Sequence, residues 1–182
     1  FKNAQFANDY IESMESYEEK KILGSQRGLQ FGGIPILKTN AKLFNCSFTY
    51  VDRLDVFKQI EWVLLCGCGV GISVEKQHLD KIPSMCDNLS KEVYIHTIAD
   101  SIEGWAEAFD ALINYYFTCD SNYPKFDYSL IRPKGAAITG GFKAPGSDGL
   151  RNSIVEVEKI LDFVWKNNKD KRLTSLNATD II

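Results

Sequence analysis

Five cysteines carry the most versatile chemistry in this chain of 182 residues. A thiolate is a nucleophile and a metal ligand, and two thiols together can deliver two electrons and end as a disulfide. Cys46 differs from the others because it lies within a short aromatic and β-branched run, residues 43–51, which is typical of a buried strand. By residue type alone, a free cysteine is most often a small buried apolar residue. A chemical role for Cys46 therefore depends on its surroundings.

Cys66 and Cys68 invite comparison with a zinc site. The further ligands would have to be His78, Cys86 and His96. Structural zinc sites use pairs of ligands two to four residues apart, and a single C-x-C followed by scattered candidates fits that pattern poorly. We therefore expect no metal site, and we expect both cysteines to be buried at a helix end.

The glycines around Cys68, in Gly67-Cys68-Gly69-Val70-Gly71, superficially resemble a dinucleotide-binding fingerprint. That fingerprint needs a strand before the glycines and a helix after them, so that the helix N-terminus faces the pyrophosphate. Here the expected order is helix and then strand. A Rossmann-type site is therefore disfavoured, and the glycines more simply permit close packing of helix and strand.

Two other glycine-rich passages contain cations that could contact phosphate. The first follows Ser25 and Arg27, where backbone N–H groups could converge on an oxyanion or the chain could simply turn. The second is a loop of some seventeen residues, 132–148, with the cations Arg132, Lys134 and Lys143. Loops of that length are usually functional or disordered, and an ordinary surface loop with solvated cations is the alternative.

Hydrophobic periodicity predicts the elements that must position these residues. Residues 5–20 form an amphipathic helix, and residues 24–33 are irregular. Residues 43–51 and 70–75 form two strands joined by a helix over 54–64, which implies a parallel pair. Asp52 and Asp55 occupy the cap and first turn of that helix. A capped helix begins at Asp100 with Glu103 completing the cap, a third strand spans 128–132, and a last long helix spans 152–165.

Composition bounds the remaining possibilities. The net charge of −3 gives no sign of the positively charged surface that binds DNA or RNA. A few well-placed cations would still suffice to bind one nucleotide. The longest apolar run, 60–74, is interrupted by Glu61 and glycines, and we expect no membrane partner. Cys86 and Cys119 have no motif around them, so we expect them to be incidental. Five cysteines without regular spacing favour a reducing compartment, and we expect a cytoplasmic protein.

Several segments together resemble one enzyme family. In chain order they are Phe44-Asn45-Cys46-Ser47-Phe48, the glycine-rich residues 65–75, Asp100-Ser101-Ile102-Glu103-Gly104-Trp105, residues 126–136 and residues 140–146. This set resembles the adenosylcobalamin-dependent (class II) ribonucleoside-triphosphate reductases. The resemblance runs from about Ile22 to the C-terminus, and residues 76–98 match no pattern.

The resemblance implies an α/β fold that is part of a ten-stranded barrel, preceded by a short helical segment. Residues 1–40 would be that segment, and residues 41–182 the first portion of the barrel, with an insertion at about 76–98. The implied activity is thiyl-radical reduction of ribonucleotides, chiefly triphosphates, with adenosylcobalamin as cofactor. The implied partners are a deoxynucleotide or ATP effector and a thioredoxin-like reductant.

The resemblance also implies roles for single residues. Cys46 would be one thiol of the reducing pair, and the substrate-binding residues would be Ser25, Arg27 and Asn45. The loop that connects an effector site to the substrate would contain Arg132, Lys134, Gly140, Gly141, Lys143 and Gly146. Asp52 would either cap the next helix or lie near the effector.

The segment that carries the radical-forming cysteine of such enzymes, resembling Asn-Pro-Cys-Gly-Glu, does not occur in these residues. We therefore expect the chain to be a piece of a longer enzyme and inactive by itself. Two alternatives remain open. One is a diiron-dependent (class I) large-subunit fragment, and the other is a nucleotide-sensing module with no catalytic role.

Overall fold

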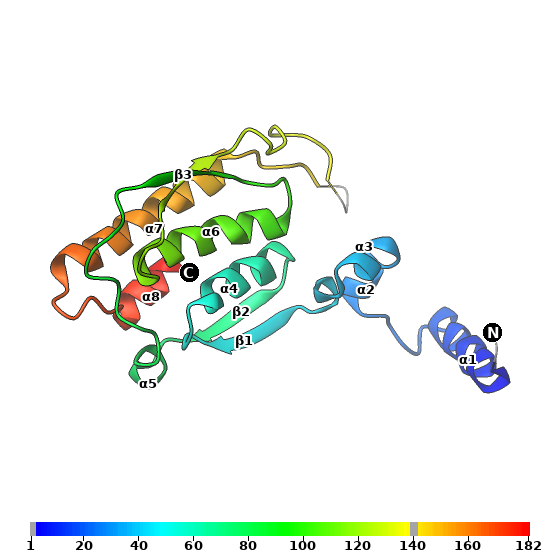
Figure 1. Cartoon of the computed structure of the whole chain (residues 1–182). Helices are drawn as coiled ribbons and strands as arrows, with labels where there is room; N and C mark the ends of the chain where they lie inside the picture. The colour runs from blue at the N-terminus through cyan, green and yellow to red at the C-terminus, as the bar shows by residue number, and fades with distance from the viewer. Residues whose placement is uncertain (1–2, 139–141) are drawn as a thin grey trace. The chain divides into compact units, whose positions relative to one another are not determined.

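The computed structural model describes residues 3–138 and 142–182. It divides into two compact units, residues 1–43 and 44–182. Each unit is described by itself below, with the element labels of Figure 1.

The first unit consists of short helices. The predicted amphipathic helix is confirmed as α1 (Ala4–Glu18), capped by the Asn3 side chain, and none of its residues is buried. The next passage, predicted to be irregular, instead contains α2 (Gln26–Phe31), α3 (Ile34–Lys38) and the 3-10 helix η1 (Asn40–Leu43). Local capping explains the difference, because the Ser25 hydroxyl caps α2 and a proline in the first turn favours α3.

The second unit begins with the predicted strand, helix and strand. These are β1 (Cys46–Tyr50), α4 (Asp55–Leu65) and β2 (Gly69–Ser73), and β1 pairs with β2 in parallel. Gly67 has a φ of 84°, a left-handed conformation that glycine adopts without strain, and it separates α4 from β2. The predicted parallel crossover is therefore confirmed.

A second parallel pair follows, and here the sequence interpretation needs correction. After α5 (Lys76–Leu79), the region with no matching pattern contains β3 (Val93–Thr97), which pairs in parallel with β4 (Tyr123–Asp127). The predicted third strand at 128–132 is therefore wrong. Its residues form turns, because the Asp127 carboxylate accepts hydrogen bonds from both the backbone N–H and the hydroxyl of Ser129.

The helix between these strands is α6 (Ile102–Phe117), which begins later than predicted. Ser101, and not Asp100, is the N-cap, and its hydroxyl accepts a hydrogen bond from the backbone N–H of Gly104 at 3.0 Å. Glu103 does not complete a capping box; its carboxylate accepts a hydrogen bond from the Trp62 indole N–H at 3.2 Å. Its apolar residues are buried from the middle of the helix to its end, namely Phe109, Leu112, Ile113 and Tyr116.

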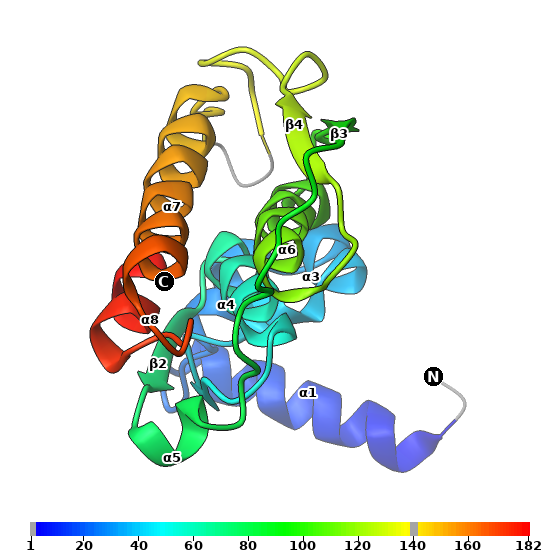
Figure 2. The ribbon, with the colours of Figure 1, turned by 60° about the vertical axis from the view of Figure 1, so that its left-hand side comes forward.

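The core of the second unit lies among its helices. The helix α6 contacts both α4 and α7 (Asp148–Asn167), and Figures 1 and 2 show α8 (Ser175–Ile181) beside α7. On α7 the apolar residues at helical spacing are buried, namely Ile154, Val157, Leu161 and Val164. Within residues 3–138 and 142–182, no helix has both the length and the apolar composition needed to cross a bilayer.

Candidate functional site

Cys46 is a free, exposed thiol at the first residue of β1. Side chains alternate between the two faces of a strand, so Cys46, Phe48 and Tyr50 share one face. Their partners on β2 in the parallel register are Gly69, Gly71 and Ser73. We call these six residues the open face.

The opposite face of the same strand pair packs toward the core through β2, whereas Ser47 on β1 is exposed. Val51, just beyond β1, is fully buried, and the β2 residues Val70 and Ile72 pack against the core of the unit. The helix α4 contacts β2 and carries the buried residues Val56, Phe57 and Ile60. The Cys46 thiol therefore lies on the sheet face that the helices of this unit leave uncovered.

The prediction that residues 43–51 form a buried strand is wrong for the described chain. Phe48 is 60% exposed and Tyr50 is 49% exposed. The rings of Phe48 and Tyr50 pack edge to face, with their centres 5.2 Å apart. The centre of the Tyr50 ring lies 4.4 Å from the centre of the His78 ring. An aromatic row therefore extends from beside Cys46 along the open face.

The glycines on β2 allow this row to pack close to the β2 backbone. A Cβ atom added at Gly71 would lie 3.2 Å from the Phe48 ring atom Cδ2, so a larger residue there would displace the ring. At Gly69, opposite Cys46, an added Cβ would make an ordinary contact of 3.6 Å with the Asn45 carbonyl oxygen. The Phe48 ring therefore packs over Gly71 on the open face.

Asn45 precedes the thiol and anchors the strand pair. Its carbonyl oxygen accepts a hydrogen bond from the Gly69 N–H at 2.9 Å. The Ser47 hydroxyl donates to the Gly69 carbonyl oxygen at 3.2 Å. These bonds hold the residues immediately before and after Cys46 against β2.

Cys66 and Cys68 are 2% and 3% exposed at the end of α4, as predicted. The structure pairs Cys86 with Cys119 in a disulfide, so the expectation that these two cysteines are incidental is wrong. Their separation of 33 residues in the sequence gives no local motif, and only folding brings their Cα atoms to 5.5 Å. In the described part of the chain, no group of three His, Cys, Asp or Glu residues is placed to hold a metal ion.

Asp52 follows β1 but does not cap α4. The N-cap position is Leu54, whereas Asp55 lies in the first turn as predicted. The Asp52 carboxylate instead pairs with Arg53 at 2.8 Å and with Lys81 at 3.4 Å. The Arg53 hydrogen bond and the two positive charges outweigh desolvation and lower the pKa of Asp52.

The substrate-binding candidates of the first unit have local partners. The Ser25 hydroxyl accepts a hydrogen bond from the Gly28 N–H at 3.4 Å and so caps α2. The Arg27 guanidinium lies 5.5 Å from the centre of the Phe31 ring. Both observations indicate a structural role, and the expected contact with substrate stays a prediction.

The loop over 132–148 is folded back on itself. Ala137 and Lys143 form an antiparallel bridge, and the Ala144 N–H donates to the Ala136 carbonyl oxygen at 2.7 Å. Lys134 and Lys143 are exposed. The predicted loop residues Gly140 and Gly141 lie outside the described residues.

Two residues fix the base of this loop. The Arg132 Nε donates to the Asp100 carboxylate at 2.6 Å, beside the N-terminus of α6. Gly146 has a φ of 79°, and a Cβ added there would lie 3.1 Å from the Lys134 backbone N. Gly146 is therefore required by both its backbone conformation and its close packing.

Comparisons with known proteins bear on this geometry. The chain is 29% identical over 188 residues to a probable adenosylcobalamin-dependent ribonucleoside-triphosphate reductase of Dictyostelium discoideum, spanning 90% of this chain and 24% of that protein. It is 30% identical over 155 residues to the adenosylcobalamin-dependent ribonucleoside-triphosphate reductase of Lacticaseibacillus paracasei, spanning 65% of this chain and 20% of that protein. The predicted resemblance is confirmed.

The crystal structure of a B12-dependent (class II) ribonucleotide reductase matches the fold. The TM-score is 0.68 at 23% identity, over 82% of this chain and 28% of that one. No family model matches the sequence. The chain therefore has the fold of one portion of a class II ribonucleotide reductase, and it spans only about a quarter of the relatives' length.

Proposed function

We propose that this chain is part of the catalytic domain of an adenosylcobalamin-dependent ribonucleoside-triphosphate reductase. The two parallel strand pairs would contribute to the ten-stranded barrel that the resemblance implies. A nucleotide would be the substrate and a thioredoxin-like dithiol the reductant. The compartment would be the cytoplasm. The names of the relatives favour the cobalamin-dependent class over the diiron-dependent alternative.

The observation that carries the proposal is the position of Cys46. In an α/β barrel the helices cover the outside, so the sheet face away from the helices is the inside. Cys46 is a free thiol on that face, at the strand position that the resemblance assigns to a reducing cysteine. A buried structural cysteine would instead lie on the helix-covered face, as Cys66 and Cys68 lie in the core.

The proposed chemistry of Cys46 balances as follows. Reduction replaces the ribose 2′-hydroxyl by hydrogen and releases one water molecule. The two electrons come from two thiols, of which Cys46 is one, and these end as a disulfide. A dithiol reductant then exchanges with that disulfide and restores both thiols for the next turnover. Gly69 and Gly71 would let the sugar approach Cys46 closely.

Adenosylcobalamin would supply the radical that starts the reaction. Within residues 3–138 and 142–182 we assign no residue to holding it, and no step above depends on it. The same holds for the second reducing thiol. The roles proposed for this chain are therefore presenting the Cys46 thiol and shaping the face around it.

Binding roles are proposed for the remaining candidates. Ser25, Arg27 and Asn45 would contact the substrate. Effector recognition would involve Asp52 and the loop residues Arg132, Lys134, Gly140, Gly141, Lys143 and Gly146. The folded-back loop with exposed lysines supports this assignment, since a lysine can bind phosphate as a point charge.

The test compares Cys46→Ser with the unchanged full-length protein in which this chain occurs. A serine hydroxyl is nearly the size of a thiol but cannot form a disulfide. We expect Cys46→Ser to abolish repeated production of deoxynucleotide with a dithiol reductant, while nucleotide binding stays unchanged. The measurement is deoxynucleotide formed per enzyme over many turnovers, with binding followed by equilibrium dialysis.

The matched control is Ser47→Ala, which changes the neighbouring residue on the other face of β1. That variant should retain turnover, because its side chain contacts only the Gly69 backbone among the described interactions. Undiminished turnover by Cys46→Ser would exclude a reducing role. Absence of any turnover by the unchanged protein, with nucleotide binding intact, would favour the nucleotide-sensing alternative.

A further inference from the structure

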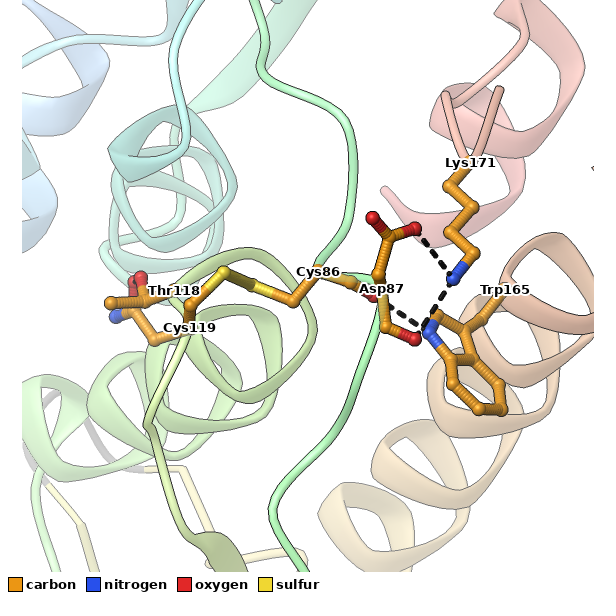
Figure 3. Close-up of a disulfide and its surroundings, with 7 residues drawn as sticks. Cys86, Asp87, Thr118, Cys119, Trp165 and Lys171 are labelled. Atoms are coloured by element: carbon orange, nitrogen blue, oxygen red, sulfur yellow. Dashed lines mark hydrogen bonds and ion pairs between the residues drawn. A yellow bond between two sulfur atoms is a disulfide. The ribbon is translucent and has the colours of Figure 1, made fainter. Parts of the chain in front are cut away.

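A second thiol pair, Cys86 and Cys119, lies away from the open face and is unused by the proposed reaction. Figure 3 shows the disulfide joining two segments that enter the second strand pair. Cys86 lies in the connection before β3, and Cys119 lies between α6 and β4. The disulfide therefore links the segment that precedes β3 to the segment that precedes β4.

The Cys86 backbone is held independently of its sulfur. Its N–H donates to the Tyr116 carbonyl oxygen of α6 at 2.9 Å. Its carbonyl oxygen accepts a hydrogen bond from the Trp165 indole N–H of α7 at 2.8 Å. Met85 is buried, and its N–H donates to the Lys171 carbonyl oxygen at 2.9 Å.

Lys171 adds a further attachment to the same segment, as Figure 3 shows. Its ammonium group donates to the Asp87 carbonyl oxygen at 3.0 Å and pairs with the Asp87 carboxylate at 3.1 Å. It also lies 5.0 Å from the centre of the Trp165 ring. The segment 85–87 would therefore stay bound to α7 if the disulfide opened.

Cys119 is also held by its backbone. It lies in a turn in which the Ser121 N–H donates to the Thr118 carbonyl oxygen at 3.2 Å. Thr118 in turn donates its N–H to the Asn114 carbonyl oxygen at the end of α6. The backbone around each cysteine is therefore held by hydrogen bonds that do not involve sulfur, so the two thiols would remain close after reduction.

The two sulfurs differ in access from solvent. Cys119 is exposed, whereas Cys86 is only 4% exposed. Thiol–disulfide exchange proceeds by attack of an external thiolate on a sulfur that it can reach, and the other sulfur leaves. The accessible end of this disulfide is Cys119, and the leaving sulfur is Cys86.

We propose that Cys86 and Cys119 form a reversible redox pair that dithiol reductants open in the folded protein. A thiolate of the dithiol attacks the Cys119 sulfur, and Cys86 leaves and takes up a proton. The second thiol of the reductant then displaces Cys119, which takes up the second proton. Two electrons and two protons pass to the pair, and the reductant ends as a disulfide.

Opening the pair has a local consequence. The disulfide is the covalent link between the segment entering β3 and the turn after α6. Once it opens, residues 88–92 keep only non-covalent contacts, namely the packing of Leu89 against the core and hydrogen bonds such as Ser90 to Asn122 at 2.9 Å and Tyr115 to the Ser90 carbonyl oxygen at 3.2 Å. The redox state therefore sets how freely residues 88–92 move while the helical core and the segment 85–87 stay in place.

The experiment equilibrates the whole chain with mixtures of reduced and oxidised dithiothreitol. Alkylation and peptide mass mapping measure the fraction of Cys86–Cys119 disulfide, and hydrogen exchange is measured at both ends of the titration. We expect a reversible transition of this pair without global unfolding. Amide exchange in residues 88–92 should rise about tenfold or more on reduction, while buried α6 amides near Leu112 stay protected.

Two variants serve as references. Cys119→Ser should show the exchange pattern of the reduced chain under all conditions, whereas Cys46→Ser should leave the Cys86–Cys119 titration unchanged. Independent alkylation of Cys86 and Cys119 after treatment with oxidised dithiothreitol would overturn the proposal. So would a disulfide that is reduced only when the chain unfolds, or reduction without a local change in exchange. The unchanged chain supplies all of these readouts, so the conclusion does not depend on the folding of Cys119→Ser.

Discussion

Glu61 lies on α4 and lines a cavity of about 510 Å³ whose walls include Trp105 and Phe109. Partial burial removes water from its carboxylate, and this desolvation raises the pKa of Glu61 above its ordinary value. The folded chain therefore holds this proton more tightly than the unfolded chain does. This difference costs stability, which falls as pH rises from the ordinary pKa of a glutamate to the raised pKa of Glu61 in the folded chain.

Glu61→Gln removes this cost. We expect the variant to have a higher free energy of unfolding than the unchanged chain at pH 7, with the gain shrinking toward pH 4. Urea unfolding at the two pH values measures the difference. Glu92→Gln, at an exposed position, is the matched control and should show no such gain. An equal effect of Glu61→Gln at both pH values would contradict the titration argument.

At the scale of elements, the N-terminus of α6 packs against the preceding backbone. A Cβ added at Gly104 would lie 2.5 Å from the Ala99 carbonyl oxygen, which is closer than real contacts allow. Gly149 in α7 has nothing within 4 Å of such an atom. Gly104 therefore permits close packing of α6 against the preceding backbone, whereas Gly149 makes no such close contact.

Alanine should have opposite effects at these two glycines. Gly104→Ala should destabilise the chain by about 1–3 kcal/mol, because the start of α6 must shift away from Ala99. Gly149→Ala should stabilise it by up to about 1 kcal/mol through helix propensity. Chemical denaturation followed by circular dichroism gives both values. A neutral Gly104→Ala would show that the backbone before α6 yields easily.

At the scale of the whole chain, the hydrophobic core belongs to one unit. The core cluster runs from Val51 to Ile181, and within the described part of the first unit only Phe31 is buried. The second unit therefore has what it needs to fold as a domain of its own. The first unit is made of short helices with many exposed apolar side chains, such as Leu37 at 84%.

Deleting residues 1–43 should leave the thermal unfolding of the second unit cooperative and its midpoint unchanged within error. A single core truncation, Leu161→Ala, should by contrast cost about 2–5 kcal/mol, because Leu161 is fully buried. Calorimetry of both variants makes the comparison. A broad or much lower transition after the deletion would show that the second unit depends on the first.

Much of the fold is readable in the sequence because it depends on near neighbours. The apolar spacing within α4 and α7 is a property of each helix by itself. The order of strand, helix and strand in the βαβ crossover is likewise set within a short stretch of sequence. Both were therefore predicted correctly. Strand β4 was missed because Pro124 argues against a strand, although an edge strand tolerates a residue without an N–H. The turn after Asp127 was missed for a different reason, because the apolar residues that follow Asp127 suggested a strand.

The candidate site was predicted in part. The sequence by itself determined that Cys46 lies in a strand paired with a glycine-rich one, because a motif and a crossover are local. It could not determine that Phe48 and Tyr50 share an uncovered face with Cys46, since the face depends on where the helices pack. Only the tertiary structure placed Lys81 beside Asp52 and Cys86 beside Cys119. Those residues are far apart in the chain, and packing of whole elements, not local preference, brings them together.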